Sequence, residues 1–217
     1  MLKTKVKASA ITHLTDARYF AAWEVVWLGF HLSPGSTESV DARLVTTLKE
    51  WVDGVKICGE YSLASLDELL EAKTLLQLDS VQLGMLTPLE TLQALQRKVE
   101  IIQELVVEAY ADLDELETFL AERQEFVDFF VLNFSKGGLQ LEDLKDGTPF
   151  ELTRLKSWAE KYPIVIDLPL NDTTPSDFLA DIPVKGFAVQ GGAEDKVGYK
   201  SFDELDAFFE DLEVLVD

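Results

Sequence analysis

Short apolar runs of strand length alternate with longer segments of helical periodicity along the whole chain. The pattern predicts strands at 6–8, 25–30, 54–58, 81–83, within 99–109, and at 126–132, 164–166 and 184–189. It predicts helices at 16–23, 40–51, 66–76, 89–97, 114–123, 150–161, 175–180 and 202–215. Ser65, followed three residues later by Glu68, is a capping box that marks the start of the third helix.

The order of these elements predicts the fold. Continuously apolar strands separated by helices are typical of a parallel sheet that helices cover on its outer side. Eight such units in 217 residues favour a closed (β/α)8 TIM barrel of the α/β class. An open, doubly wound sheet is the alternative, which the lack of a glycine-rich turn after the first strand disfavours. Because no linker or shift of composition interrupts the pattern, we expect a single domain over residues 1–217.

A barrel of this kind binds ligands at the C-terminal ends of its strands. The predicted strand ends therefore bring eight residues to one mouth: Ser9, His31, Cys58, Gly84, Tyr110, Asn133, Asp167 and Gly191.

Charge and composition limit the partners. Forty acidic residues against 19 basic ones give a net charge of −21, which disfavours nucleic acid and polyanionic small molecules. No apolar run reaches the roughly 18 residues of a membrane span, and the lone Cys58 cannot form an internal disulfide, so we expect a cytoplasmic protein. The spacing of histidine, cysteine and carboxylate residues indicates no metal site, and we expect no cofactor. A small-molecule ligand is possible, and the sequence does not indicate the oligomeric state.

The strand ends also carry a family resemblance. Residues 6–12 read V-K-A-S-A-I-T and are followed by Asp16-Ala17 and Leu28-Gly29-Phe30. They resemble the V-K-I-C-G-I-T, D-A and L-G-F segments that open phosphoribosylanthranilate isomerases. Further similar segments follow, at Pro34, Ser36 and Val40, at 81–84, 127–133, 136–138 and 189–194, and at Gly198 and Lys200. The resemblance implies a TIM barrel and the Amadori rearrangement of a phosphoribosylamine in tryptophan biosynthesis.

The residues that would carry this chemistry differ. Ser9 stands at the position of the family's catalytic base, a cysteine, and a serine hydroxyl ionises too weakly for this role unless a neighbouring base activates it. Asn133 stands at the position of the acid, an aspartate, and an amide cannot give up a proton as a carboxylic acid does. Glu38 corresponds to the arginine that contacts the substrate, which reverses the charge.

The phosphate site is altered as well. In the family, backbone N–H groups of glycine-rich loops after strands seven and eight hold the phosphate. Here strand seven is followed by Asp167-Leu168-Pro169-Leu170-Asn171, where Pro169 lacks an N–H and Asp167 adds a carboxylate. Only Gly191-Gly192, after strand eight, keeps the family pattern. The candidate ligand-binding residues are Glu38, Gln82, Asp167, Asn171, Gly191, Gly192 and His31.

Three functions stay open. The favoured hypothesis is a non-catalytic relative that binds a small molecule or a partner, because base, acid, arginine and half of the phosphate site differ together. The second is an enzyme of changed chemistry that uses Glu38, Asp167 or His31 on a neutral or cationic ligand. The third is an active isomerase with relocated groups, such as Cys58, His31 or Asp128. The V-K-I-C-G string at 55–59 is set aside, because the I-T and L-G-F segments do not follow it.

Overall fold

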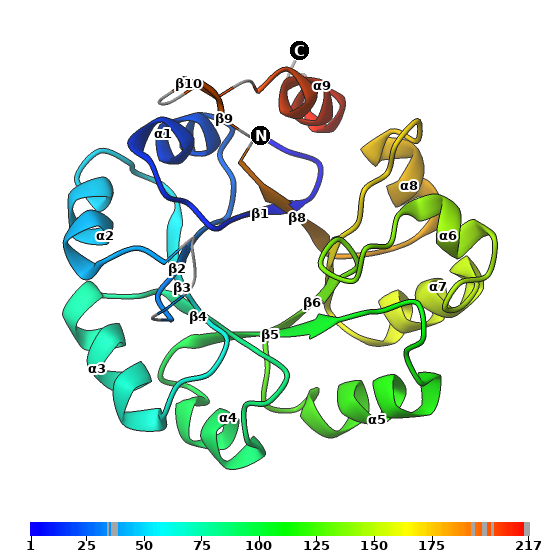
Figure 1. Ribbon diagram of the computed structural model, residues 1–217, viewed down its shortest axis with the longest axis horizontal. Coiled ribbons are helices and arrows are strands. Elements are labelled where there is room, and N and C mark those ends of the chain that lie inside the picture. The colour runs from blue at the N-terminus through cyan, green and yellow to red at the C-terminus, as the bar shows by residue number, and fades with distance from the viewer. Residues whose placement is uncertain (34, 36–38, 192–193, 197–198, 201, 215–217) are drawn as a thin grey trace.

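Eight parallel strands form a closed barrel in the computed structural model, which describes residues 1–33, 35, 39–191, 194–196, 199–200 and 202–214 (Figure 1). The barrel strands are β1 (Lys5–Ser9), β2 (Trp27–His31), β3 (Lys56–Tyr61), β4 (Ser80–Leu83), β5 (Glu100–Val106), β6 (Phe129–Asn133), β7 (Ile164–Asp167) and β8 (Gly186–Gln190). The ring closes where β1 pairs with β8, with Val6 opposite Phe187. The predicted (β/α)8 TIM barrel is thereby confirmed.

Helices surround the barrel, as Figure 1 shows. They are α1 (Leu14–Ala22), α2 (Ala42–Lys49), α3 (Leu66–Leu76), α4 (Leu89–Leu95), α5 (Leu113–Arg123), α7 (Leu152–Lys161), α8 (Pro175–Asp181) and α9 (Asp203–Leu212). The capping box of α3 is confirmed, since Ser65 and Glu68 each bond the other's backbone N–H. The sequence did not predict the short helix α6 (Leu141–Lys145) or the small pair β9 (Glu194–Lys196) and β10 (Tyr199–Lys200), because segments this short show no measurable periodicity.

The strands alternate between two environments, as the two-residue period of a strand requires. On β1, Val6 and Ala8 pack outward against the helices, whereas Lys7 and Ser9 face the interior of the barrel. The interior contains its own apolar cluster, formed by Trp27, Cys58, Ile102, Val131, Val165 and Ala188.

Cys58 corrects one expectation. We predicted that it ends the third strand at the mouth, but β3 continues to Tyr61. Cys58 therefore lies in the middle of the barrel and is fully buried. Burial raises the pKa of its thiol to about 11, so that Cys58 behaves as a small apolar side chain.

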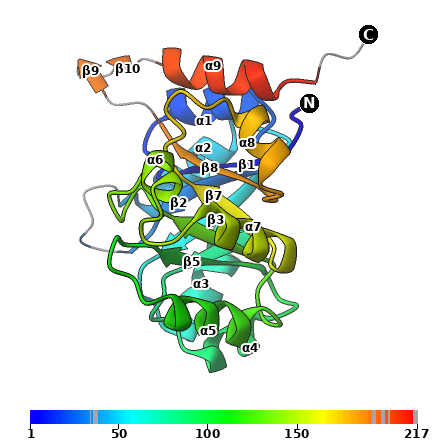
Figure 2. The same ribbon diagram turned by 90° about the vertical axis from the view of Figure 1, so that its right-hand side faces the viewer.

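Helix α9 closes the chain onto its beginning, and Figure 2 shows it lying beside α1. The fully buried ring of Phe209 stacks on Trp23 of the α1 C-cap, with centroids 5.2 Å apart, and meets Phe20 edge-on at 6.0 Å. Next to these rings, Leu2 pairs with Glu213 in an isolated bridge. The first and last described segments thus hold each other in place.

Candidate functional site

A cavity of about 220 Å³ opens at the C-terminal ends of the barrel strands. We call it the mouth cavity, and most of the residues around it are polar. It is lined by Ser9, Ala10, His31, Glu60, Tyr61, Ser62, Gln82, Glu104, Val131, Asn133, Lys136 and Gln190. Four candidates from the sequence, Ser9, His31, Gln82 and Asn133, therefore meet at one site.

A buried ion pair stands beside Ser9. Lys7, which is fully buried, forms a salt bridge with Glu60 of β3 and donates a hydrogen bond to Ser9 Oγ over 2.8 Å. The other carboxylate oxygen of Glu60 accepts from the backbone N–H of Ala10 at 3.1 Å. Gly29 makes room for the pair, because a Cβ there would lie 2.0 Å from Glu60 Oε1 and 2.8 Å from Lys7 Nζ.

The charge of Lys7 decides what Ser9 can do. Burial is the largest single influence on the pKa of Lys7 and acts to lower it, but the attraction and hydrogen bond of Glu60, together with the other acidic groups nearby, outweigh burial and raise the pKa above its ordinary value. Lys7 is therefore an ammonium that donates to Ser9 Oγ, whereas activation of a serine requires a neighbour that takes its proton.

Asn133 is held in a second network. Its Nδ2 donates to Glu104 Oε1 at 2.9 Å, and its Oδ1 accepts from the backbone N–H of Lys136 at 2.9 Å. Lys136 Nζ reaches the same Oε1 of Glu104 at 2.6 Å. These bonds identify the amide orientation and fix Asn133 between a carboxylate and the loop after β6.

Asp167 ends β7 directly opposite Asn133 in the strand register. Its carboxylate accepts a hydrogen bond from Ser135 Oγ, and it is not part of the cavity lining. Burial raises the pKa of this carboxyl, although the hydrogen bond from Ser135 acts in the opposite direction.

The other candidates lie elsewhere. Asn171 points to α6, where its Nδ2 donates to Gln140 Oε1 at 3.0 Å and to Glu142, so it does not line the mouth cavity. Gly191 directly follows the lining residue Gln190 and faces the Asp16 carboxylate of α1. Glu38 and Gly192 lie outside the described residues.

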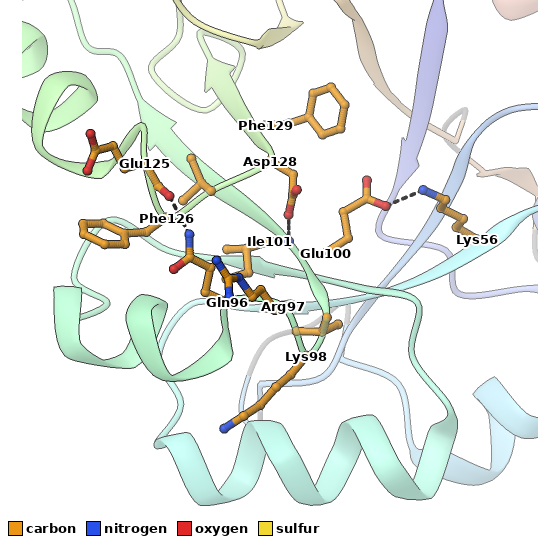
Figure 3. Close-up of a pocket in the computed structure, with 12 residues that line it drawn as sticks. Lys56, Gln96, Arg97, Lys98, Glu100, Ile101, Glu125, Phe126, Asp128 and Phe129 are labelled. Carbon is orange, nitrogen blue, oxygen red and sulfur yellow. Dashed lines mark hydrogen bonds and ion pairs between the residues drawn. The ribbon is translucent and has the colours of Figure 1, made fainter.

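A second hollow, the lower cavity, measures about 660 Å³ and lies at the opposite, N-terminal end of the strands (Figure 3). Asp128 lines it and accepts from the backbone N–H of Ile101 at 2.7 Å. Asp128 is therefore at the end of the barrel away from Ser9 and Asn133. Arg97 and Lys98 stand beside it, together with the Lys56–Glu100 ion pair.

Sequence reasoning missed Lys7, Glu60, Glu104 and Lys136 as members of the site. Glu60 and Glu104 carried one signal, because each is a charged residue inside a predominantly apolar strand segment. Lys7 appeared only as part of a family motif. Its partner Glu60 is 53 positions away, and only the closed barrel brings the two together.

Among the described residues, no group of histidine, cysteine and carboxylate side chains could hold a metal ion. Within the same ranges, no helix is long and apolar enough to cross a membrane.

The sequence model of N-(5'-phosphoribosyl)anthranilate isomerase matches residues 6–211. The solved isomerase of Thermotoga maritima aligns with a TM-score of 0.76 at 19% identity, covering 96% of this chain and 98% of that one. The isomerase of Thermus thermophilus gives 0.71 at 22% identity with the same coverage. No match was found among curated proteins.

Proposed function

The chain belongs to the N-(5'-phosphoribosyl)anthranilate isomerase family, and we propose that it is a member that does not perform the isomerisation. Instead of converting the family's substrate, the mouth cavity binds a small, polar molecule that has no phosphate group. The family membership sets where a ligand sits, at the C-terminal ends of the strands. The side chains at that place set which chemistry is available there.

One observation carries the proposal: both positions of the family's proton-transfer pair are occupied by side chains fixed to charged neighbours. Ser9 Oγ accepts from the Lys7 ammonium, and Asn133 bridges Glu104 and the Lys136 backbone. Acid–base catalysis needs one group that takes a proton and one that gives it near neutral pH. Neither a serine beside an ammonium nor an amide supplies this.

The loop after β7 supports the absence of a phosphate group in the ligand. Asp167 brings a carboxylate to the position of the family's phosphate loop, and Pro169 has no N–H to donate. One added carboxylate near a dianion costs on the order of 1–4 kcal/mol at surface-like dielectric. Lost donors to a charged group cost roughly 1–3 kcal/mol more, so binding weakens by at least about tenfold.

The proposal is tested with the family's own reaction. Purified protein is mixed with enzymatically generated phosphoribosylanthranilate, and the gene is expressed in a tryptophan-auxotrophic strain that lacks the isomerase. We expect no turnover and no growth, with the Thermotoga maritima isomerase as the positive control in both assays. Growth of the strain would overturn the proposal.

A binding measurement addresses the phosphate separately. Calorimetric titration with reduced 1-(o-carboxyphenylamino)-1-deoxyribulose 5-phosphate, a compound present in one solved family structure, should give no measurable heat of binding. Low-micromolar affinity would mean that the phosphate site survives, and the third hypothesis, an isomerase with relocated groups, would then be the better account. Cys58 and Asp128 give that account little support, because neither lines the mouth cavity.

A second candidate function is proton transfer on a neutral or cationic substrate. The observation that favours it is Asp167, a buried carboxyl with a raised pKa that stands opposite Asn133. Such a group could act as an acid or a base in place of the missing pair. If the wild type forms product and the Asp167→Asn variant does not, this candidate is favoured over a protein that only binds its ligand.

A further inference from the structure

We infer that the mouth cavity binds the ammonium group of a small amine between Gln82 and Glu104. This inference rests on the proposed function and narrows its ligand to one chemical class. Two acceptor atoms at this cavity lack a donor among the described residues, and the ligand would supply one.

Gln82 supplies the first acceptor. The residue is only 6% exposed, yet its side-chain Oε1 has no hydrogen-bond partner within the part of the chain that the structure describes. Gln82 lies opposite Glu60 in the strand register, so both side chains face the interior of the barrel, and both line the cavity. A buried amide oxygen without a partner costs free energy, which a donor on a ligand would recover.

Glu104 supplies the second acceptor. Its Oε1 receives both Asn133 and Lys136, whereas Oε2 accepts no hydrogen bond from any described residue. Gln82 is paired with Ile102 on β5, and Glu104 lies two residues further along on the same face. Two acceptor residues on adjacent strands, diagonal to each other in the register, therefore line one cavity.

The charges around the cavity favour a cation over a neutral donor. Two carboxylates line the cavity, Glu60 and Glu104, and each forms an ion pair, with Lys7 and Lys136 respectively. Asp167 does not line the cavity but lies next to Asn133 in the strand register and is a third carboxyl group close to it. With Asp167 ionised, the balance is three negative charges against two positive, or one negative charge in excess. The net charge of −21 adds a field of the same sign, which attracts cations and repels anions. An ammonium also has three N–H donors, enough to reach both acceptors at once.

The other lining residues indicate which groups the rest of the ligand carries. Ser9, His31, Asn133 and Gln190 surround the cavity with hydroxyl, imidazole and amide groups. A ligand that fills 220 Å³ among such groups carries hydroxyl or amide groups of its own, because polar side chains left dry are costly. An amino alcohol or an amino sugar fits this description.

The test uses matched pairs of probes that differ in one group. Ethanolamine, 4-aminobutanol and glucosamine are compared with ethylene glycol, 1,4-butanediol and glucose, by thermal shift and by calorimetry up to millimolar concentrations. At least one amine should bind roughly tenfold more tightly than its hydroxyl partner. If no amine binds, or if every hydroxyl partner binds equally well, the inference is wrong.

Variants locate the binding. Glu104→Gln and Gln82→Leu should each weaken binding of the amine by about tenfold or more. Glu90→Gln on the exposed part of α4 makes the same charge change outside the cavity and should leave the affinity unchanged. Melting without ligand verifies that each variant is folded, and Gln82→Leu tests the site independently if Glu104→Gln does not fold. Unaltered affinity in both variants would place the amine elsewhere and overturn the inference.

The result of the amine-binding test can be distinguished from the result of the test of the proposed function. Binding of a neutral polyol without preference for amines would remove the ammonium inference and leave a non-catalytic binding barrel. Turnover of phosphoribosylanthranilate would remove the proposed function, whatever the amines do.

Discussion

Single side chains decide the character of the mouth cavity. Ser9 and Asn133 differ little in size from the cysteine and aspartate of the family pattern, so these exchanges alter the chemistry at two positions without requiring a change in the shape of the barrel. Both are held by ionic neighbours, Ser9 through Lys7 and Asn133 through Glu104. These neighbours are therefore where substitution should have measurable consequences.

The first prediction concerns the buried ion pair. Glu60→Gln leaves the Lys7 ammonium in the barrel interior without its carboxylate, and the free energy of unfolding should fall by about 3–5 kcal/mol. Urea unfolding followed by circular dichroism measures this change. The double variant Lys7→Met/Glu60→Gln is the control and should recover most of the loss, because neither residue of the pair then carries a charge. A single variant as stable as the wild type would contradict this view of the pair.

The second prediction concerns pH. Burial raises the pKa of Asp167 in the folded protein above its unfolded value, so the folded state binds the proton more tightly. As the pH rises from the unfolded pKa through the folded one, this carboxyl therefore lowers the stability. Asp167→Asn removes the effect and should be more stable than the wild type at neutral pH.

The difference between the two proteins should vanish in acid, below both pKa values. Urea unfolding across that pH range is the measurement, and Asp177→Asn in the first turn of α8 is the exposed control. A difference that is constant with pH would show that Asp167 does not titrate with folding.

At the scale of elements, the contact of α9 with α1 closes the helical ring. Phe209 is fully buried between aromatic rings of α1 and its C-cap, whereas Phe208, its neighbour on the same helix, is only half-buried against Phe187. Because the two residues have the same side chain, replacing each by alanine removes the same atoms, and the two substitutions differ in how deeply those atoms are buried. They form a matched pair for measuring what this contact contributes.

The third prediction uses that pair. Phe209→Ala leaves a cavity in the aromatic cluster and should lower the free energy of unfolding by about 3–5 kcal/mol. Phe208→Ala should cost clearly less, because its ring is partly in contact with water already. Denaturant unfolding of both variants gives the comparison. Equal losses would mean that α9 does not pack on α1 as described.

At the scale of the whole molecule, the net charge of −21 is the dominant property. The excess of negative charge repels anions at long range, and the like charges also repel one another within the folded state. Local pairs such as Lys7–Glu60 and Lys136–Glu104 offset only a small part of it. Stability should therefore depend on the screening of charges by salt.

The fourth prediction follows from this repulsion. Raising NaCl from about 0.01 M to 0.15 M shortens the screening length from about 30 Å to 8 Å. The melting temperature should rise by about 2–4 °C, as a gain of about 1 kcal/mol would give in a chain of this size. Tetramethylammonium chloride should act equally if screening is the cause. An unchanged or lower melting temperature would show that the acidic surface does not limit stability.

The sequence by itself determined the order of the elements and predicted the end of the barrel at which several candidate residues meet. Alternation of apolar strands and amphipathic helices is a local property, and it predicted all eight barrel units. The predicted boundaries differ from the observed ones by a few residues. The apolar run begins at Val25, for example, whereas β2 begins at Trp27, because apolar residues extend beyond the paired part of the strand. Of the eight residues that the strand ends predicted at the mouth, three line the cavity: Ser9, His31 and Asn133. Gln82, which was named from the family resemblance, lines it as well.

Only the tertiary structure decided what these residues can do. The partner of Lys7 is 53 positions away on β3, and the donors to Glu104 come from the end of β6 and the loop that follows it. Local sequence patterns cannot predict such pairs, because the residues meet only through the closure of the barrel and the register of its strands. Whether Ser9 stands beside a base or an ammonium, and whether Gln82 has a partner, depends on these long-range contacts. The fold follows from short-range hydrophobic periodicity, whereas the chemistry of the mouth follows from charges that meet only in the folded chain.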